Sequence, residues 1–64
     1  MNTTRFINVR AFAEGSNEIQ VEIEGKEIWV PKVQIHPSSE VQEAPDEGTL
    51  VVNTFWARKH KLVA

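Results

Sequence analysis

Apolar and polar residues alternate along much of this chain. This period of two indicates strands with one buried face, because successive strand side chains point to opposite sides. The alternation predicts strands at Arg5–Ala13, Glu18–Glu24 and Glu27–Val30. The second is the clearest, since every other residue in it is Ile or Val and the residues between are Glu or Gln.

The first predicted strand carries apolar residues in both phases, so we expect it to be covered on both sides. One face would hold Ile7, Val9, Ala11 and Ala13, and the other Phe6, Asn8, Arg10 and Phe12. Gly15-Ser16-Asn17 and Glu24-Gly25-Lys26 separate the three strands. Both are rich in the small or left-handed-tolerant residues that tight hairpin turns require.

The second half of the chain is less regular. Pro31 has no N–H for a ladder, so it predicts a sheet edge, a bulge or a kink before another strand at Val33–Ile35. After the polar break at 36–39, Glu40–Ala44 is a short predicted strand with Val41 inward. Pro45-Asp46-Glu47-Gly48 is typical of a type I turn that its glycine closes. The apolar run Leu50–Val52 predicts a buried strand.

A change of period after Val52 predicts a short C-terminal helix. Asn53 or Thr54 would cap its first turn, and basic residues near its end complement the helix dipole. We expect its aromatic pair, Phe55 and Trp56, to cover an open end of the sheet.

These elements predict a mainly β fold in a single domain over residues 1–64. It is a small bent antiparallel sheet of four or five strands, or an SH3-like or OB-like barrel, with the short helix across one end. Barrel closure would remove unprotected sheet edges, and an open sheet with the helix on one face is the alternative. The predicted core is Ile19, Val21, Ile23, Ile28, Val30, Ile35, Leu50 and Val52.

The chain has 64 residues and no cysteine, so a single small core must stabilise it without disulfides. We therefore expect that it can form a homodimer. The absence of cysteine and of any long apolar run favours a cytoplasmic protein with no membrane attachment, in the host cytoplasm if a phage encodes it.

Acidic residues are confined to the middle of the chain, from Glu14 to Glu47, and both ends carry only basic charges. The net charge is −2. The row Glu18, Glu22 and Glu24 is interpreted as a solvated strand face that discourages aggregation, because the dense ligand loop of a calcium site is missing. We expect no metal and no cofactor.

Catalysis needs a nucleophile with a base, paired carboxylates in a pocket, or a metal constellation, and none is evident in the sequence. The two histidines, His36 and His60, stand in no ligand spacing, and we interpret them as a turn residue and an exposed helix residue. The sequence therefore predicts a protein that is not an enzyme.

The strongest functional signal is a set of aromatic and basic residues, because rings stack on bases while cations follow phosphates. The candidate binding residues are Trp29, Lys32, Trp56, Arg58, Lys59 and Lys61. The structural alternative makes Phe55 and Trp56 core residues and the basic turn a helix terminus. Trp29 falls in the phase opposite the core, where its ring would pack under the helix or mark an interface.

The segments Glu27-Ile28-Trp29-Val30-Pro31-Lys32-Val33-Gln34-Ile35 and Phe55-Trp56-Ala57-Arg58-Lys59-His60-Lys61-Leu62-Val63 give the chain a family resemblance. It resembles a loose group of small, uncharacterised bacteriophage and prophage proteins with a β-rich body and an aromatic, basic C-terminal segment. The resemblance implies an accessory factor of phage DNA metabolism or of host takeover. It assigns no role to individual residues.

The prediction for function is a non-catalytic binding module of phage type that acts through protein contacts. The alternative is a nucleic-acid-binding accessory protein. Net acidity favours a protein partner, because non-specific nucleic-acid binding requires local positive charge over the docking face.

Overall fold

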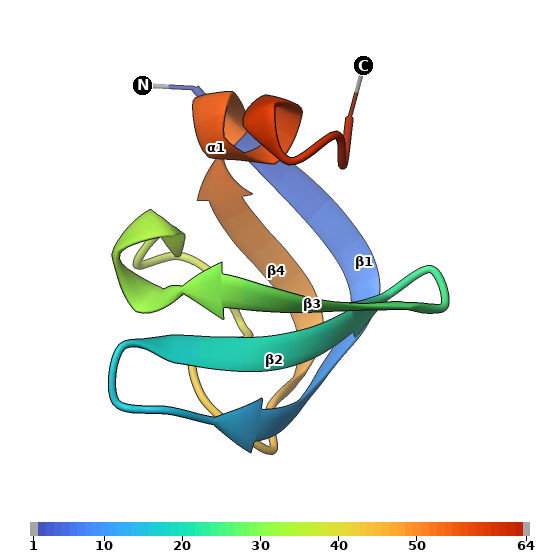
Figure 1. Cartoon of the computed structure of the whole chain (residues 1–64), viewed down its shortest axis with the longest axis vertical. Helices are drawn as coiled ribbons and strands as arrows, with labels where there is room; N and C mark the ends of the chain where they lie inside the picture. The colour runs from blue at the N-terminus through green and yellow to red at the C-terminus, as the bar shows by residue number, and fades with distance from the viewer. Residues whose placement is uncertain (1, 64) are drawn as a thin grey trace.

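A computed structural model describes residues 2–63 of the chain. Its elements are β1 (Thr3–Glu14), β2 (Glu18–Ile23), β3 (Lys26–Pro31), the 3-10 helix η1 (Lys32–Gln34), β4 (Glu47–Asn53) and α1 (Thr54–Lys59). The strands form one antiparallel sheet in the order β3-β2-β1-β4, with α1 at one end (Figure 1). The predicted mainly β fold with a C-terminal helix is therefore confirmed. The sheet is bent and does not close into a barrel.

The long strand β1 produces the bend, because it pairs with β4 through its first half and with β2 through its second (Figure 1). The register with β4 shifts between Phe6 and Val9, where Asn8 has a φ of 55°. Asparagine tolerates this left-handed conformation better than most residues, and such a bulge inserts an extra residue into a strand.

The bulge at Asn8 corrects the predicted faces of the first strand. Phe6 and Val9 face the core instead of Ile7 and Val9, and Ile7 is 72% exposed. The extra residue at Asn8 reverses the alternation of core-facing and solvent-facing side chains along β1. A strict period of two does not predict this reversal.

The β2–β3 hairpin is built on a two-residue turn at Glu24 and Gly25, whose φ angles are 50° and 83°. Positive φ at both positions is the signature of a type I′ turn, whose twist matches that of the flanking strands. The strand predicted to include Glu24 therefore ends at Ile23.

Three predictions between Pro31 and Gly48 are wrong. Residues 32–34 form η1 instead of a strand, and Ile35 makes only a single bridge, to Val52. Residues 40–44 are a loop, although Val41 is buried as expected. The residues Glu47 and Gly48, expected in a turn, already belong to β4.

The loop between Ile35 and β4 covers the outer edge of that strand. His36 N donates to Val51 O (2.8 Å), and Glu40 N donates to Thr49 O (2.9 Å). The buried hydroxyl of Ser39 accepts from Val51 N (3.0 Å) and donates to Val41 O (2.9 Å). Irregularly spaced backbone bonds and the Ser39 side chain together replace a regular ladder here, which is why strand periodicity fails in this segment.

The core lies on one face of the sheet. Seven of the eight predicted core residues are buried, and they are Ile19, Val21, Ile23, Val30, Ile35, Leu50 and Val52. The eighth, Ile28, is half-buried, because β3 has no neighbour on its far side. The core also contains Val9 and Ala11 of β1, Val41 of the loop, and Trp56 and Ala57 of α1.

The cap of the helix α1 is Asn53, one of the two residues predicted for it. The Asn53 Oδ1 atom accepts from Phe55 N (2.8 Å) and from Trp56 N (3.2 Å), so two otherwise unpaired donors are satisfied. Only one ring of the expected aromatic pair covers the sheet, since Trp56 is buried and Phe55 is 77% exposed. No helix within residues 2–63 is long and apolar enough to cross a membrane.

Candidate functional site

The six candidate binding residues do not form one surface. Trp56 is 7% exposed, and its ring centroid lies 4.7 Å from that of His60. A ring packed into the core on one side and against an imidazole on the other has no free face for a base. Trp56 is therefore a core residue, as the structural alternative held.

Three of the cations lie together at the end of α1. Arg58 and Lys59 occupy its last turn, and Lys61 follows with a φ of 60°. All three are exposed. Leu62 N donates to Ala57 O (2.9 Å) just beyond, which closes the helix end, and positive charge at that end complements the helix dipole.

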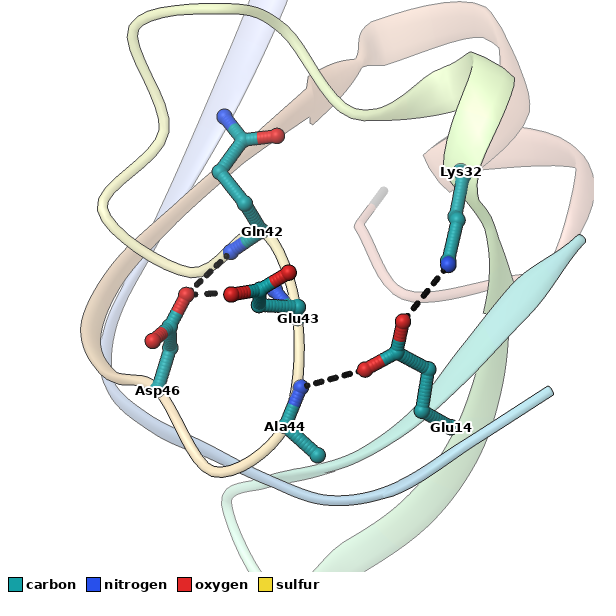
Figure 2. A network of polar contacts seen from close by, with 6 residues as sticks. All are labelled: Glu14, Lys32, Gln42, Glu43, Ala44 and Asp46. Carbon is teal, nitrogen blue, oxygen red and sulfur yellow. Dashed lines mark hydrogen bonds and ion pairs between the residues drawn. The ribbon is translucent and has the colours of Figure 1, made fainter. Parts of the chain in front are cut away.

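Lys32 is engaged in a structural contact. Its Nζ atom lies 2.7 Å from Oε2 of Glu14, and Oε1 of the same carboxylate accepts from Ala44 N (3.2 Å), as Figure 2 shows. The Glu14 side chain thus joins the end of β1 to the start of η1 and to the loop before β4 (Figure 2). The hydrogen bond from Lys32, followed by that from Ala44, lowers the pKa of Glu14 below its usual value.

Trp29 is the candidate that remains accessible. It lies on β3 at 46% exposure, on the face of the sheet opposite the core, which we call the outer face. The helix α1 contacts mainly β1 and β4, and the exposure of the Trp29 ring shows that it is not buried under the helix. The half-exposed ring of Trp29 offers a partner an apolar surface, and its indole N–H is a hydrogen-bond donor.

The outer face has an aromatic row and a charged row. Register places Trp29 beside Gln20 of β2 and Gln20 beside Ala13 of β1, where Phe12 is the unpaired bulge residue. The next row holds Glu27 of β3, Glu22 of β2 and Arg10 of β1. Trp29 and Glu27 are therefore neighbours at the sheet margin.

The backbone N–H and C=O groups of Glu27 and Trp29 on β3 also point outward, away from β2. In a two-residue hairpin the residues that flank the turn exchange hydrogen bonds, and bonded pairs then alternate. Lys26, Ile28 and Val30 therefore bond to β2, and a bond from Lys32 N to Asn17 O (2.9 Å) continues this phase. The amides and carbonyls of Glu27 and Trp29 point away from the sheet, where β3 is the end of the strand order.

Sequence reasoning identified Trp29 but missed Ile28 and Glu27 as parts of the same edge. Pro31 was the available signal, because proline within a strand is confined to sheet edges and the starts of strands. It marked β3 as a margin, and the half-buried state of Ile28 follows from that position.

Two hollows lie elsewhere on the surface. A cleft of about 480 Å³ lies between the Asn8 bulge and the β2–β3 turn, and is lined by Phe6, Ile7, Asn8, Glu22, Ile23, Glu24 and Gly25. The second lies beside η1 and is lined by Thr3, Val33, Gln34, Ile35, His36, Pro37 and Asn53. Neither contains a nucleophile paired with a base and an orienting group. No group of three His, Cys, Asp or Glu side chains within residues 2–63 is arranged to hold a metal ion.

Comparison of the chain with models of protein families, with curated proteins and with solved structures finds no match.

Proposed function

We propose that the protein is a non-catalytic binding module that acts through protein contacts, and that an extended segment of its partner adds to the sheet along β3. The observation that carries this proposal is the state of the β3 edge, defined as Lys26–Pro31. This edge combines unpaired outward backbone groups with two half-exposed large side chains, Ile28 and Trp29.

Strand addition uses both parts of the edge. Backbone hydrogen bonds to the outward groups of Glu27 and Trp29 supply affinity without regard to sequence, and pockets for alternate side chains supply specificity. A six-residue strand is matched by a partner segment of about six residues, roughly 20 Å long. The other margin of the sheet is less suitable, because the loop through Ser39 already bonds to β4.

The segment is expected to run antiparallel to β3, as every strand pair in the sheet does. In that arrangement a partner residue opposite Trp29 exchanges hydrogen bonds with it and projects onto the outer face. A partner residue opposite Ile28 projects toward the core and covers the exposed half of the isoleucine.

The resemblance to small phage proteins extends the proposal. It supports a phage-type accessory or host-modulating role, in which the module contacts a host or phage protein. Such a role needs no catalytic group.

Titration of 15N-labelled protein with the neutral hexapeptide Thr-Val-Thr-Val-Thr-Val tests the proposal. We expect amide shift changes concentrated in residues 26–30, since Pro31 has no amide proton. Methylating the threonine amides, which would bond to β3, should abolish binding. Methylating the valine amides, which would face solvent, should leave it intact. Absence of binding, or equal effects of the two methylated peptides, would contradict antiparallel strand addition.

A nucleic-acid-binding role is the second candidate, and the exposed cations Arg58, Lys59 and Lys61 favour it. Anisotropy of a labelled single-stranded oligonucleotide at two salt concentrations tests it. Binding that weakens with salt and is lost when all three are replaced by Ala would establish phosphate contacts. We expect no such binding, since three cations on one short helix end are few and the chain is net negative.

A further inference from the structure

We infer that the segment received by the β3 edge is cationic, with Lys or Arg alternating with apolar residues. This inference rests on the proposed strand addition and specifies the chemistry of the partner. It is carried by the charges that flank the edge and by the register in which an added strand would meet them.

The outer face beside β3 is acidic. Glu18, Glu22, Glu24 and Glu27 all belong to the β2–β3 hairpin, whose strands and turn otherwise carry one cation, Lys26. Glu14–Lys32 is the sole ion pair within residues 2–63, so no basic side chain neutralises these glutamates directly. A cationic ligand would find four carboxylates on the hairpin against the single ammonium group of Lys26.

Glu22 and Glu27 form a directly opposed cross-strand pair. Such residues have Cβ atoms roughly 4.5–5.5 Å apart, and like charges at that separation repel. Arg10 stands on the far side of Glu22 in the same row, whereas Glu27 has solvent on its far side. A cation added beyond Glu27 would give each carboxylate of the row a basic neighbour, Arg10 beside Glu22 and the added cation beside Glu27.

The neighbouring row offers the second cation position. A partner side chain opposite Trp29 would lie beside the exposed ring, where an ammonium or guanidinium group gains a cation–π contact. Between these two positions, the residue opposite Ile28 would turn to the core side, where an apolar side chain is required. The edge therefore selects a pattern of cation, apolar residue, cation.

The same charges disfavour two other occupants. A second copy of the chain adding through its own β3 would place one acidic hairpin beside another. A nucleic acid would bring phosphates against the glutamates at 18, 22, 24 and 27. Both would meet like-charge repulsion at this edge.

Binding of three labelled hexapeptides, measured by fluorescence anisotropy, tests the inference. They are Lys-Val-Lys-Val-Lys-Val, Thr-Val-Thr-Val-Thr-Val and Glu-Val-Glu-Val-Glu-Val, which share one apolar phase and differ in charge. We expect the lysine peptide to bind most tightly and the glutamate peptide least, with the difference shrinking as salt is raised. The homodimer expected from the sequence would have to leave the β3 edge free, so a dimer found by sedimentation should still bind the lysine peptide.

Glu27→Gln should weaken the lysine peptide roughly two- to five-fold, as expected for an exposed charge pair, and leave the threonine peptide unchanged. Glu43→Gln removes an equally exposed carboxylate from the distant loop and should change neither. Equal binding of all three peptides would overturn the cationic preference while supporting strand addition. Failure of all three to bind would overturn both, as would a dimer that buries the β3 edge.

Discussion

Glu22 and Glu27 lie directly opposite each other on β2 and β3, so two carboxylates face each other across the hairpin on the exposed side of the sheet. An opposed pair of like charges is unfavourable by a few tenths of a kcal/mol up to about 1 kcal/mol. This repulsion lies at the margin of the sheet, beside the ring of Trp29. The pair thus connects the stability of the hairpin to the proposed recognition of a cationic strand.

Glu27→Lys is expected to stabilise the protein, because it replaces the opposed carboxylates with an opposite-charge pair. The gain in the free energy of unfolding should be about 0.5–1 kcal/mol, measured by urea denaturation at low salt. Glu43→Lys changes the net charge equally without a cross-strand partner and serves as the control. A destabilised Glu27→Lys variant would contradict the register. The same change should weaken binding of the lysine peptide.

Gly48→Ala is expected to destabilise the protein by roughly 1–3 kcal/mol in the same assay. Gly48 has a φ of 138°, and a Cβ atom there would lie 2.6 Å from Oε1 of Glu40. That oxygen also accepts the hydrogen bond from Thr49 N, so it cannot move away freely. Gly15→Ala is the matched control, since its Cβ would meet nothing closer than 3.6 Å. Equal effects of the two substitutions would refute this account.

Ser39→Ala is expected to cost roughly 1–3 kcal/mol, because it leaves the buried Val51 N–H without its acceptor. The substitution also removes the contacts that hold Val41 over the core. Thermal denaturation followed by circular dichroism measures the loss. Ser16→Ala changes an exposed serine and should have almost no effect. A Ser39→Ala variant as stable as the wild type would mean that another group satisfies Val51.

The stability of the protein should fall with acid partly through Glu14. Its pKa is lower in the folded protein than in the unfolded chain, so the unfolded chain takes up the proton first as pH falls. The contribution of Glu14 to the free energy of unfolding is therefore complete above the usual pKa of 4.5. It is lost as pH falls through the lower pKa of the folded state. The free energy of unfolding, measured by denaturation between pH 7 and pH 3, should fall less steeply below pH 4.5 in Glu14→Gln than in the wild type.

Local rules predicted the parts of the fold that local forces determine. The alternation over Glu18–Ile23 identified the buried face of β2, and the cap of α1 is Asn53, one of the two residues predicted for it. Both depend on neighbours within a few residues, so period and side-chain type suffice. The same rules failed at Ile7, because a single bulge at Asn8 reversed the phase of the strand.

Tertiary structure decided which candidate residues are available to a partner. The sequence showed that Trp29 lies in the phase opposite the core, and that Trp56 and Lys32 belong to an aromatic and basic set. It could not show that Trp56 packs into the core or that Lys32 pairs with Glu14 across 18 positions of the chain. Those outcomes depend on contacts between distant segments. Likewise, strand order alone made β3 a sheet margin and left Ile28 half-exposed, because a strand with one neighbour can cover only one of its sides.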